Sequence, residues 1–289
     1  MKNLIIFLVL FIVMLNQSMA QNKINVIVIG AHPDDCDIDA GGTAILFSKA
    51  GHNVMFVSVT NGDAGHYEKG GGALAKIRRT EAQEAGKRFG VKYVVLDHHD
   101  GELMPTLDIR LEIIRLIRQW NADIVIGPRP NDYHPDHRNT AILLQDAAYM
   151  VIVPNVAPDT PPLKKNPVFL YTEDGFQKPT PFQPDVAVDI TSVFDQKVYA
   201  MAAHESQFFE WLPWTNGTLD NVPKTEAERL KWLAEWRKPG INDKTRESII
   251  KWYGKEKAGQ AKYAEGFEIC EYGRRPSDEE IRKLFPFFD

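Results

Sequence analysis

Cysteine, long apolar runs and excess positive charge are all scarce in this chain. Only Cys36 and Cys270 occur among 289 residues, too few for a disulfide framework. The formal net charge of −5 provides no general attraction to nucleic acid or to an anionic membrane, and only a local basic patch could still supply one. We therefore do not expect nucleic acid as a partner.

The one long apolar run lies at the N-terminus. It covers residues 4–15, after Lys2 and before Ser18-Met19-Ala20, a small-residue pattern that signal peptidases accept. The run is too short for a membrane-spanning helix, which needs about 20 residues. We interpret residues 1–20 as a signal peptide that is cleaved after Ala20. The mature protein, residues 21–289, is then secreted or periplasmic and has no transmembrane segment.

Short β-branched segments alternate with segments of helical periodicity over most of the chain. We expect strands at 24–30, 54–60, 93–96, 123–127 and 186–190, and helices at 41–49, 73–89, 108–120 and 193–207. This alternation predicts an α/β fold with a mostly parallel sheet that is covered by helices on both faces. No repeat or long linker occurs, so we expect one domain over 21–289, with 208–289 as a C-terminal helical extension and 151–183 as irregular loops.

The most polar loops follow the first and the fourth predicted strand. One contains His32-Pro33-Asp34-Asp35 and the other contains His134-Pro135-Asp136-His137. The carboxyl ends of parallel strands lie at one edge of a sheet, where ligands of such folds bind. The two loops could therefore share one mouth.

These loops hold the residue types of a metal-dependent hydrolase. His32 and Asp35 could bind one ion together, and His137 could complete the three protein ligands of a catalytic zinc site. Asp34, His134 and Asp136 then remain free to move protons or to stabilise charge. A single His-Pro-Asp is more often a capped turn, but two of them at corresponding positions favour metal chemistry.

The sequence resembles the PIG-L (LmbE-like) family of N-acetylglucosaminyl deacetylases. The resemblance covers about 24–207 and rests on the two loops and on shorter matches: Gly41-Gly42, Thr60-Asn61-Gly62, Arg78-Arg79-Thr80-Glu81, Phe89-Gly90-Val91, Asp100-Gly101-Glu102-Leu103 and His204-Glu205-Ser206-Gln207. It implies a Rossmann-like fold and hydrolysis of the amide of N-acetylated glucosamine derivatives.

The resemblance also implies roles for single residues. It implies one zinc ion on His32, Asp35 and His137, with Asp34 as the general base. It implies His134 as the electrostatic or acid partner, supported by Asp136.

Two further residues of this pattern lead to weaker expectations. Cys36 stands where the family usually has glutamate, so a carboxylate contact is missing there. A small buried residue is the ordinary role of a free cysteine, and zinc ligation by Cys36 would be crowded. Arg78 could reach the sugar or an acidic group attached to it, although a solvated helix face is the ordinary role for such an arginine.

Two other functions compete with the deacetylase hypothesis. A catalytically inactive carbohydrate-binding module on the same fold would need neither Asp34 nor His134. A dinucleotide-binding oxidoreductase would need Gly-x-Gly-x-x-Gly after the first strand, where this chain has carboxylates that repel a pyrophosphate. The exact amino-sugar substrate, the oligomeric state and the choice among zinc, iron and cobalt are not specified by the sequence.

The N-terminal pattern makes the first testable prediction. We expect Edman sequencing of the mature protein to begin at Gln21 or at a neighbouring residue, because Ser18-Met19-Ala20 fits the peptidase. Recovery of the protein from the cytosol with Met1 intact would contradict export.

Overall fold

The computed structural model describes residues 23–288. The predicted signal peptide lies outside the described residues. None of the helices within 23–288 has the length and apolar character required to cross a membrane.

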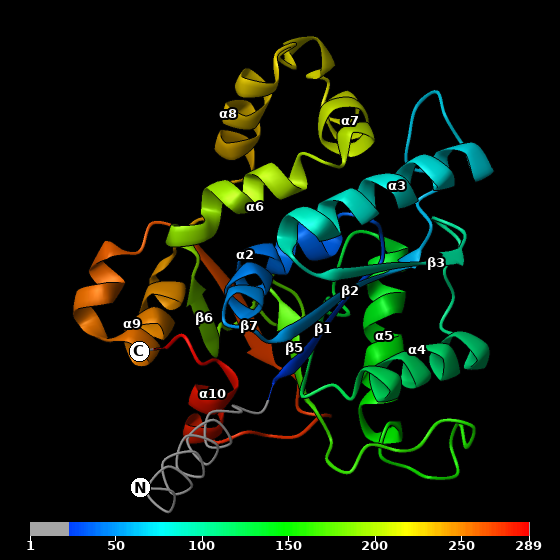
Figure 1. Cartoon of the computed structure of the whole chain (residues 1–289), viewed down its shortest axis with the longest axis vertical. Helices are drawn as coiled ribbons and strands as arrows, with labels where there is room; N and C mark the ends of the chain where they lie inside the picture. The colour runs from blue at the N-terminus through cyan, green and yellow to red at the C-terminus, as the bar shows by residue number, and fades with distance from the viewer. Residues whose placement is uncertain (1–22, 289) are drawn as a thin grey trace, which may run out of the picture.

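A seven-stranded sheet forms the centre of the molecule, with the strand order β3-β2-β1-β4-β5-β7-β6 (Figure 1). Strands β1 to β5 run parallel, and β7 pairs antiparallel with both β5 and β6. The bounds are β1 Asn25–Gly30, β2 Asn53–Thr60, β3 Lys92–His98, β4 Ile124–Gly127, β5 Val168–Thr172, β6 Val186–Asp189 and β7 Ala264–Ile269. The expected mostly parallel α/β sheet is confirmed.

Helices cover both faces of the sheet, as Figure 1 shows for α2, α3 and α6 on one face and α4 and α5 on the other. Their bounds are α2 Asp35–Lys49, α3 Gly71–Phe89, α4 Leu107–Trp120, α5 Pro135–Met150 and α6 Phe194–Met201. Alternation along β1 produces this arrangement, because Val26 and Val28 pack with α2 and α3, whereas Ile27 and Ile29 pack with α4 and α5.

The C-terminal extension contains the expected helices but is not entirely helical. It comprises the end of the π-helical η2 (Ser206–Trp211), α7 Leu212–Thr215, η3 Leu219–Asn221, α8 Glu226–Arg237, α9 Asp243–Gln260 and α10 Asp278–Leu284. It also provides β7, which lies between β5 and β6 in the sheet. The extension therefore completes the fold rather than being attached to its surface.

Gly127 ends β4 at a point where the backbone packs too closely for a side chain. A Cβ atom there would overlap Leu144 Cδ1 and come within 3.0 Å of the carbonyl oxygen of Ile29. Because Ile29 is sheet backbone, that oxygen can move little. The small residue thus lets β4 and α5 approach each other beside β1.

We expect Gly127→Ala to lower the free energy of unfolding by about 1–3 kcal/mol, as overpacking of a core does. Gly175→Ala is the matched control, since a Cβ atom at Gly175 meets nothing within 4 Å. Urea denaturation of both variants measures the difference. Equal stability of the two variants would show that β4 and α5 can separate at little cost.

Candidate metal centre

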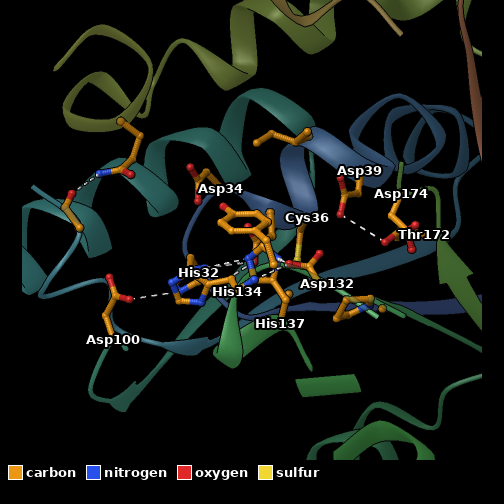
Figure 2. Close-up of a pocket in the computed structure, with 18 of the residues that line it drawn as sticks. His32, Asp34, Cys36, Asp39, Asp100, Asp132, His134, His137, Thr172 and Asp174 are labelled. Atoms are coloured by element: carbon orange, nitrogen blue, oxygen red, sulfur yellow. Dashed lines mark hydrogen bonds and ion pairs between the residues drawn. The ribbon is translucent and has the colours of Figure 1, made fainter. Parts of the chain in front are cut away.

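The two histidine-containing loops meet at the middle of the sheet. β1 and β4 are neighbours, but the chain continues from β1 towards β2 and from β4 towards β5. Such a switch point leaves a crevice at the carboxyl ends of the strands. A cavity of about 570 Å³ opens there, lined by both loops and by residues of the C-terminal extension (Figure 2).

The loop after β1 is fixed by the carboxylate of Asp35, the first residue of α2. Its Oδ2 accepts hydrogen bonds from the backbone N–H groups of Ala31 and His32, both at 2.8 Å. Gly30 makes this close turn feasible, because a Cβ atom there would lie 2.6 Å from Asp35 Cβ. Asp34 adopts φ 156° and ψ −22°, an unusual backbone conformation for a residue other than glycine.

The second loop is fixed by the start of α5. His134 is the N-cap, and its Nδ1 accepts the backbone N–H of Asp136 at 3.2 Å. Pro135 at the first helical position suits this start, since its missing N–H needs no partner there. His137 follows in the first turn of α5, on the side that faces His32.

Three potential ligand atoms lie at the mutual distances of a metal site. His32 Nδ1 lies 3.1 Å from His137 Nε2 and 3.6 Å from Asp35 Oδ2, and the latter two atoms are 3.4 Å apart. In a zinc tetrahedron with bonds near 2.0 Å, ligand atoms are separated by about 3.3 Å. The predicted ligand set is therefore brought together, and its geometry fits a divalent cation.

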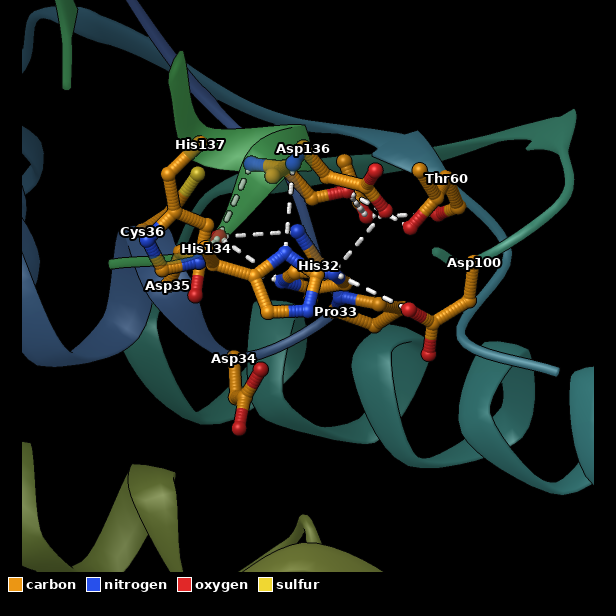
Figure 3. A network of polar contacts seen from close by, with 12 residues as sticks. His32, Pro33, Asp34, Asp35, Cys36, Thr60, Asp100, His134, Asp136 and His137 are labelled. Atoms are coloured by element: carbon orange, nitrogen blue, oxygen red, sulfur yellow. Dashed lines mark hydrogen bonds and ion pairs between the residues drawn. The ribbon is translucent and has the colours of Figure 1, made fainter. Parts of the chain in front are cut away.

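The opposite nitrogens of the two imidazoles are held by carboxylates, which are labelled in Figure 3 for His32 and in Figure 2 for His137. His32 Nε2 lies 3.1 Å from Asp100 Oδ1 and 3.3 Å from Asp136 Oδ2, and His137 Nδ1 lies 3.1 Å from Asp132 Oδ1. Carboxylates in this position fix the tautomer and ring orientation of metal-binding histidines.

Asp136 has a different partner from the one expected. Its carboxylate is fully buried and contacts His32 and the backbone N–H groups of Gly101 and Leu103, whereas only its own backbone N–H bonds His134. The reason is the helical start at Pro135, which turns the Asp136 side chain towards the loop after β3. Asp136 therefore orients a candidate ligand instead of supporting His134.

Sequence reasoning missed two members of the site, Asp100 and Asp132. Asp100 follows β3 in an Asp-Gly turn, and Asp63 anchors it by accepting its backbone N–H at 3.0 Å. Asp132 precedes His134 by two residues and accepts the His134 backbone N–H at 2.8 Å. Both aspartates follow strands that end at the cavity. Asp100 also begins the family match Asp100-Gly101-Glu102-Leu103, which was a second signal for it.

The electrostatics of the centre call for a cation. Burial would lower the pKa of both imidazoles, but the neighbouring carboxylates raise the pKa of His32 well above its usual value and that of His137 to about 10. Burial would raise the pKa of Asp35, yet His137 and His32 hold it well below its usual value. Two protonated imidazoles would repel each other at 3.1 Å. A divalent cation between their lone pairs supplies the charge without that repulsion.

Other donor sets lie close to this one. Donor atoms of His32, His134 and His137 lie within 4.8 Å of one another, as do those of His32, Asp100 and Asp136. In the second set His32 uses Nε2, which already contacts the two carboxylates. In the first set Nδ1 of His134 is occupied by the helix cap. We favour the set with Asp35, since its three atoms have the separations of a tetrahedron.

Asp34 lies apart from the ligand network in Figure 3. Arg78, which is buried, donates from Nη2 to Asp34 Oδ1 at 3.2 Å and to the carbonyl oxygen of Pro33 at 2.8 Å. Burial raises the pKa of the Asp34 carboxyl, and the charge of Arg78 opposes this. Arg78 is therefore not on a solvated helix face; it lines the cavity, and its contacts are with partners within the protein. Its primary contact is with Asp34.

Cys36 and His204 are structural. Cys36 is buried, and its Sγ lies 3.4 Å and 3.5 Å from the carbonyl oxygens of Val28 and Val57. The buried carboxylate at this point of α2 is Asp37, which accepts from the Tyr93 hydroxyl at 2.9 Å and contacts His204 Nε2 at 3.0 Å. Cys36 therefore packs under the site, as expected of a small buried residue.

Comparison with known proteins identifies relatives of this chain. Residues 27–148 match the family model PIG-L, GlcNAc-PI de-N-acetylase. The chain is 34% identical to diacetylchitobiose deacetylase of Thermococcus kodakarensis over 65% of this chain and 73% of that protein. It is 26% identical to 4-oxalmesaconate hydratase of Pseudomonas putida over 71% of this chain and 84% of that protein.

A solved structure extends the comparison to the fold. N,N'-diacetylchitobiose deacetylase from Pyrococcus horikoshii resembles this chain with a TM-score of 0.63 at 27% identity, over 88% of each chain. That coverage extends well past the 27–148 segment of the family model and so includes part of the C-terminal extension.

The ligand geometry predicts that His137→Ala loses most of its metal, because the tetrahedron then lacks one protein ligand. Elemental analysis after loading with zinc measures this loss. His99→Ala is the control: His99 is exposed and its Nδ1 lies 2.7 Å from Asp63 rather than at the centre. Full zinc occupancy in His137→Ala would make His134 the next candidate ligand.

Proposed function

Because the chain belongs to the PIG-L (LmbE-like) family of N-acetylglucosaminyl deacetylases, we propose that it hydrolyses the N-acetyl amide of an N-acetylglucosamine-type sugar or sugar conjugate. The observation that carries this proposal is the triangle of His32, Asp35 and His137 with a separate carboxylate, Asp34, beside it. We further propose zinc as the metal, since two imidazoles and one carboxylate are typical catalytic zinc ligands.

The three ligands would hold the ion at one end of the cavity. A divalent ion there polarises the amide carbonyl and lowers the pKa of water. The backbone N–H groups of Ala31 and His32 keep the Asp35 carboxylate in position. The carboxylates on the far nitrogens keep both rings in the orientation that directs Nδ1 of His32 and Nε2 of His137 inward.

Asp34 is suited to be the general base. It lines the cavity next to the ligand Asp35 but has no part in the ligand network, so it is free to accept a proton from the attacking water. Burial raises its pKa and makes it a stronger base, while Arg78 fixes its orientation. Arg78 is thus a positioning residue for Asp34.

His134 is suited to the opposite role. It lines the cavity, and its Nδ1 is used by the α5 cap, which leaves Nε2 as the nitrogen able to act on a substrate. Burial lowers the pKa of His134. From Nε2 it could stabilise the oxygen of the tetrahedral intermediate or donate a proton to the leaving amine.

The hydratase among the relatives suggests a second reaction, which the cavity disfavours. Oxalmesaconate is a carboxylate anion, whereas seven carboxylates and only three arginines line the cavity. The formal charge of the cavity lining thus stays negative even with a divalent cation, which disfavours an anionic substrate. A neutral N-acetylated sugar avoids this repulsion. An inactive binding module would likewise have no use for the buried pair of Asp34 and Arg78.

The direct test is release of a primary amine from a panel of N-acetylated sugars by the zinc-loaded protein. We expect Asp34→Asn to keep the metal and the fold but to lose at least about a hundredfold in kcat, with a smaller change in KM, because the amide cannot accept the proton. Asp97→Asn, at an exposed carboxylate that contacts Arg79, is the control and should retain activity.

Two results would overturn this assignment. Turnover near that of the wild type in Asp34→Asn would show that another group is the base. Loss of zinc from Asp34→Asn would show that Asp34, and not Asp35, is the ligand.

A further inference from the structure

The cavity has a polar wall that the proposed reaction does not use. Asp39, Thr172 and Asp174 lie together in Figure 2, on the side of the cavity away from Asp100. Asp39 comes from α2, while Thr172 and Asp174 come from the end of β5 and the loop that follows it. This wall, completed by Arg237 from the C-terminal extension, is called the distal wall below.

The carboxylates of the distal wall have unused hydrogen-bonding capacity. Asp39 Oδ2 accepts the Thr172 hydroxyl at 3.2 Å, and its Oδ1 has no hydrogen bond within residues 23–288. Asp174 Oδ1 accepts the backbone N–H of Phe176 at 2.8 Å and lies 3.4 Å from Arg129 Nη1. Asp174 Oδ2 is buried without a partner in the described part of the chain. Both side chains can therefore accept further hydrogen bonds.

Arg237 provides donors at the same wall. It is the last residue of α8, and its guanidinium lies 4.2 Å from the ring centre of Trp236 and 5.5 Å from that of Phe208. Among the residues that the structure describes, Arg237 makes no ion pair, and its Nε is buried without a hydrogen-bond partner. A guanidinium that is held by aromatic rings but has free N–H groups is ready to bind a ligand.

The cavity continues beyond Arg237. A neighbouring cavity of about 370 Å³ shares Ile38, Asp39, Glu173 and Arg237 with the metal-containing cavity. A ligand anchored at the metal centre can therefore extend past the distal wall. The space suits a substrate longer than one sugar ring.

We propose that Arg237 and Asp39, together with Asp174, bind the hydroxyl groups of a second sugar residue, adjacent to the N-acetylglucosamine unit that reacts. Sugar hydroxyls both donate and accept, and the distal wall offers carboxylate acceptors beside guanidinium donors. This inference rests on the proposed deacetylase function and gives the C-terminal extension, through Arg237, a part in the choice of substrate length.

The charge of the wall favours a neutral partner for this subsite. Asp39, Glu173 and Asp174 all line it, and Arg129 is already close to Asp174. An anionic group beside Arg237 would therefore face several carboxylates, and their repulsion offsets the attraction of one guanidinium. A second sugar ring carries no charge and meets no such repulsion.

Comparing the binding affinities of a monosaccharide and a disaccharide tests the subsite independently of the reaction. We would titrate N-acetylglucosamine and N,N'-diacetylchitobiose calorimetrically into zinc-loaded protein in the Asp34→Asn background, which slows turnover. We expect the disaccharide to bind at least about tenfold more tightly than the monosaccharide, as several extra hydrogen bonds would provide. Adding Arg237→Met should remove this preference and leave binding of the monosaccharide within about twofold.

Two further variants test whether Arg237→Met changes sugar binding directly or through an altered structure. Lys231→Met removes an exposed charge from the same helix without touching the cavity and should leave both affinities unchanged. Asp39→Asn tests the wall from α2 and should also weaken the disaccharide selectively. Equal affinities of the parent for the two sugars, or equal losses for both sugars in Arg237→Met and Asp39→Asn, would overturn the subsite.

Amine release by the wild type tests the proposed function separately. A preference for the disaccharide that depends on Arg237, without amine release from any sugar, would refute deacetylation and retain the subsite. An N-acetylglucosaminide that carries a carboxylate is the third ligand of the titration. Tighter binding of that anion than of diacetylchitobiose would show that Arg237 binds an acidic group instead of hydroxyls.

Discussion

Two imidazole nitrogens that face each other at 3.1 Å, Nδ1 of His32 and Nε2 of His137, impose the constraint on which this site depends. Two lone pairs at that distance repel each other unless a positive charge lies between them. Carboxylates beside the outer nitrogens add negative charge and so favour a cation further. Asp35 adds a third donor at the same separation. The geometry is thus poorly suited to packing alone and well suited to a divalent cation.

The sheet topology provides the rigidity that this constraint demands. His32 follows β1 and His137 lies in the first turn of α5, so each is attached to an element that cannot shift without disturbing the core. Gly30 and Gly127 remove the side chains that would otherwise separate these elements. A close approach of backbone at the switch point therefore determines the distance between two side chains that are 105 residues apart.

The sequence was sufficient to predict the parts of the fold and site that depend on local pattern. Periodicity predicted the central strands and α4, and the two loops predicted the three candidate ligands. Prediction from the sequence failed where the pattern is short or misleading. The strand β5 lies in a segment that reads as irregular because prolines surround it, and β7 lies in a tail whose neighbours are helical. The first turn of α2 reads as a loop because it is rich in aspartate. These aspartates are not on a solvated face: Asp35 lies at the metal centre, and Asp37 contacts Tyr93 and His204.

Contacts across the sheet were beyond the reach of sequence reasoning, and they decide the roles of several residues. Asp132 lies in no matched motif, and the match that contains Asp100 assigned it no role. Asp136 contacts His32 because the start of α5 lies beside the loop after β1. The segment that matches the family model, residues 27–148, contains all the candidate ligands and Asp34, whereas Thr172, Asp174 and Arg237 lie beyond it. The metal centre is therefore encoded within the family segment, whereas most of the distal wall, except Asp39 of α2, is encoded beyond it. β7 and α8 of the extension are part of the same fold as the metal centre. Changes in the extension can therefore alter which substrates the cavity accepts while the metal centre stays intact. This is consistent with relatives that share this fold but act on different substrates.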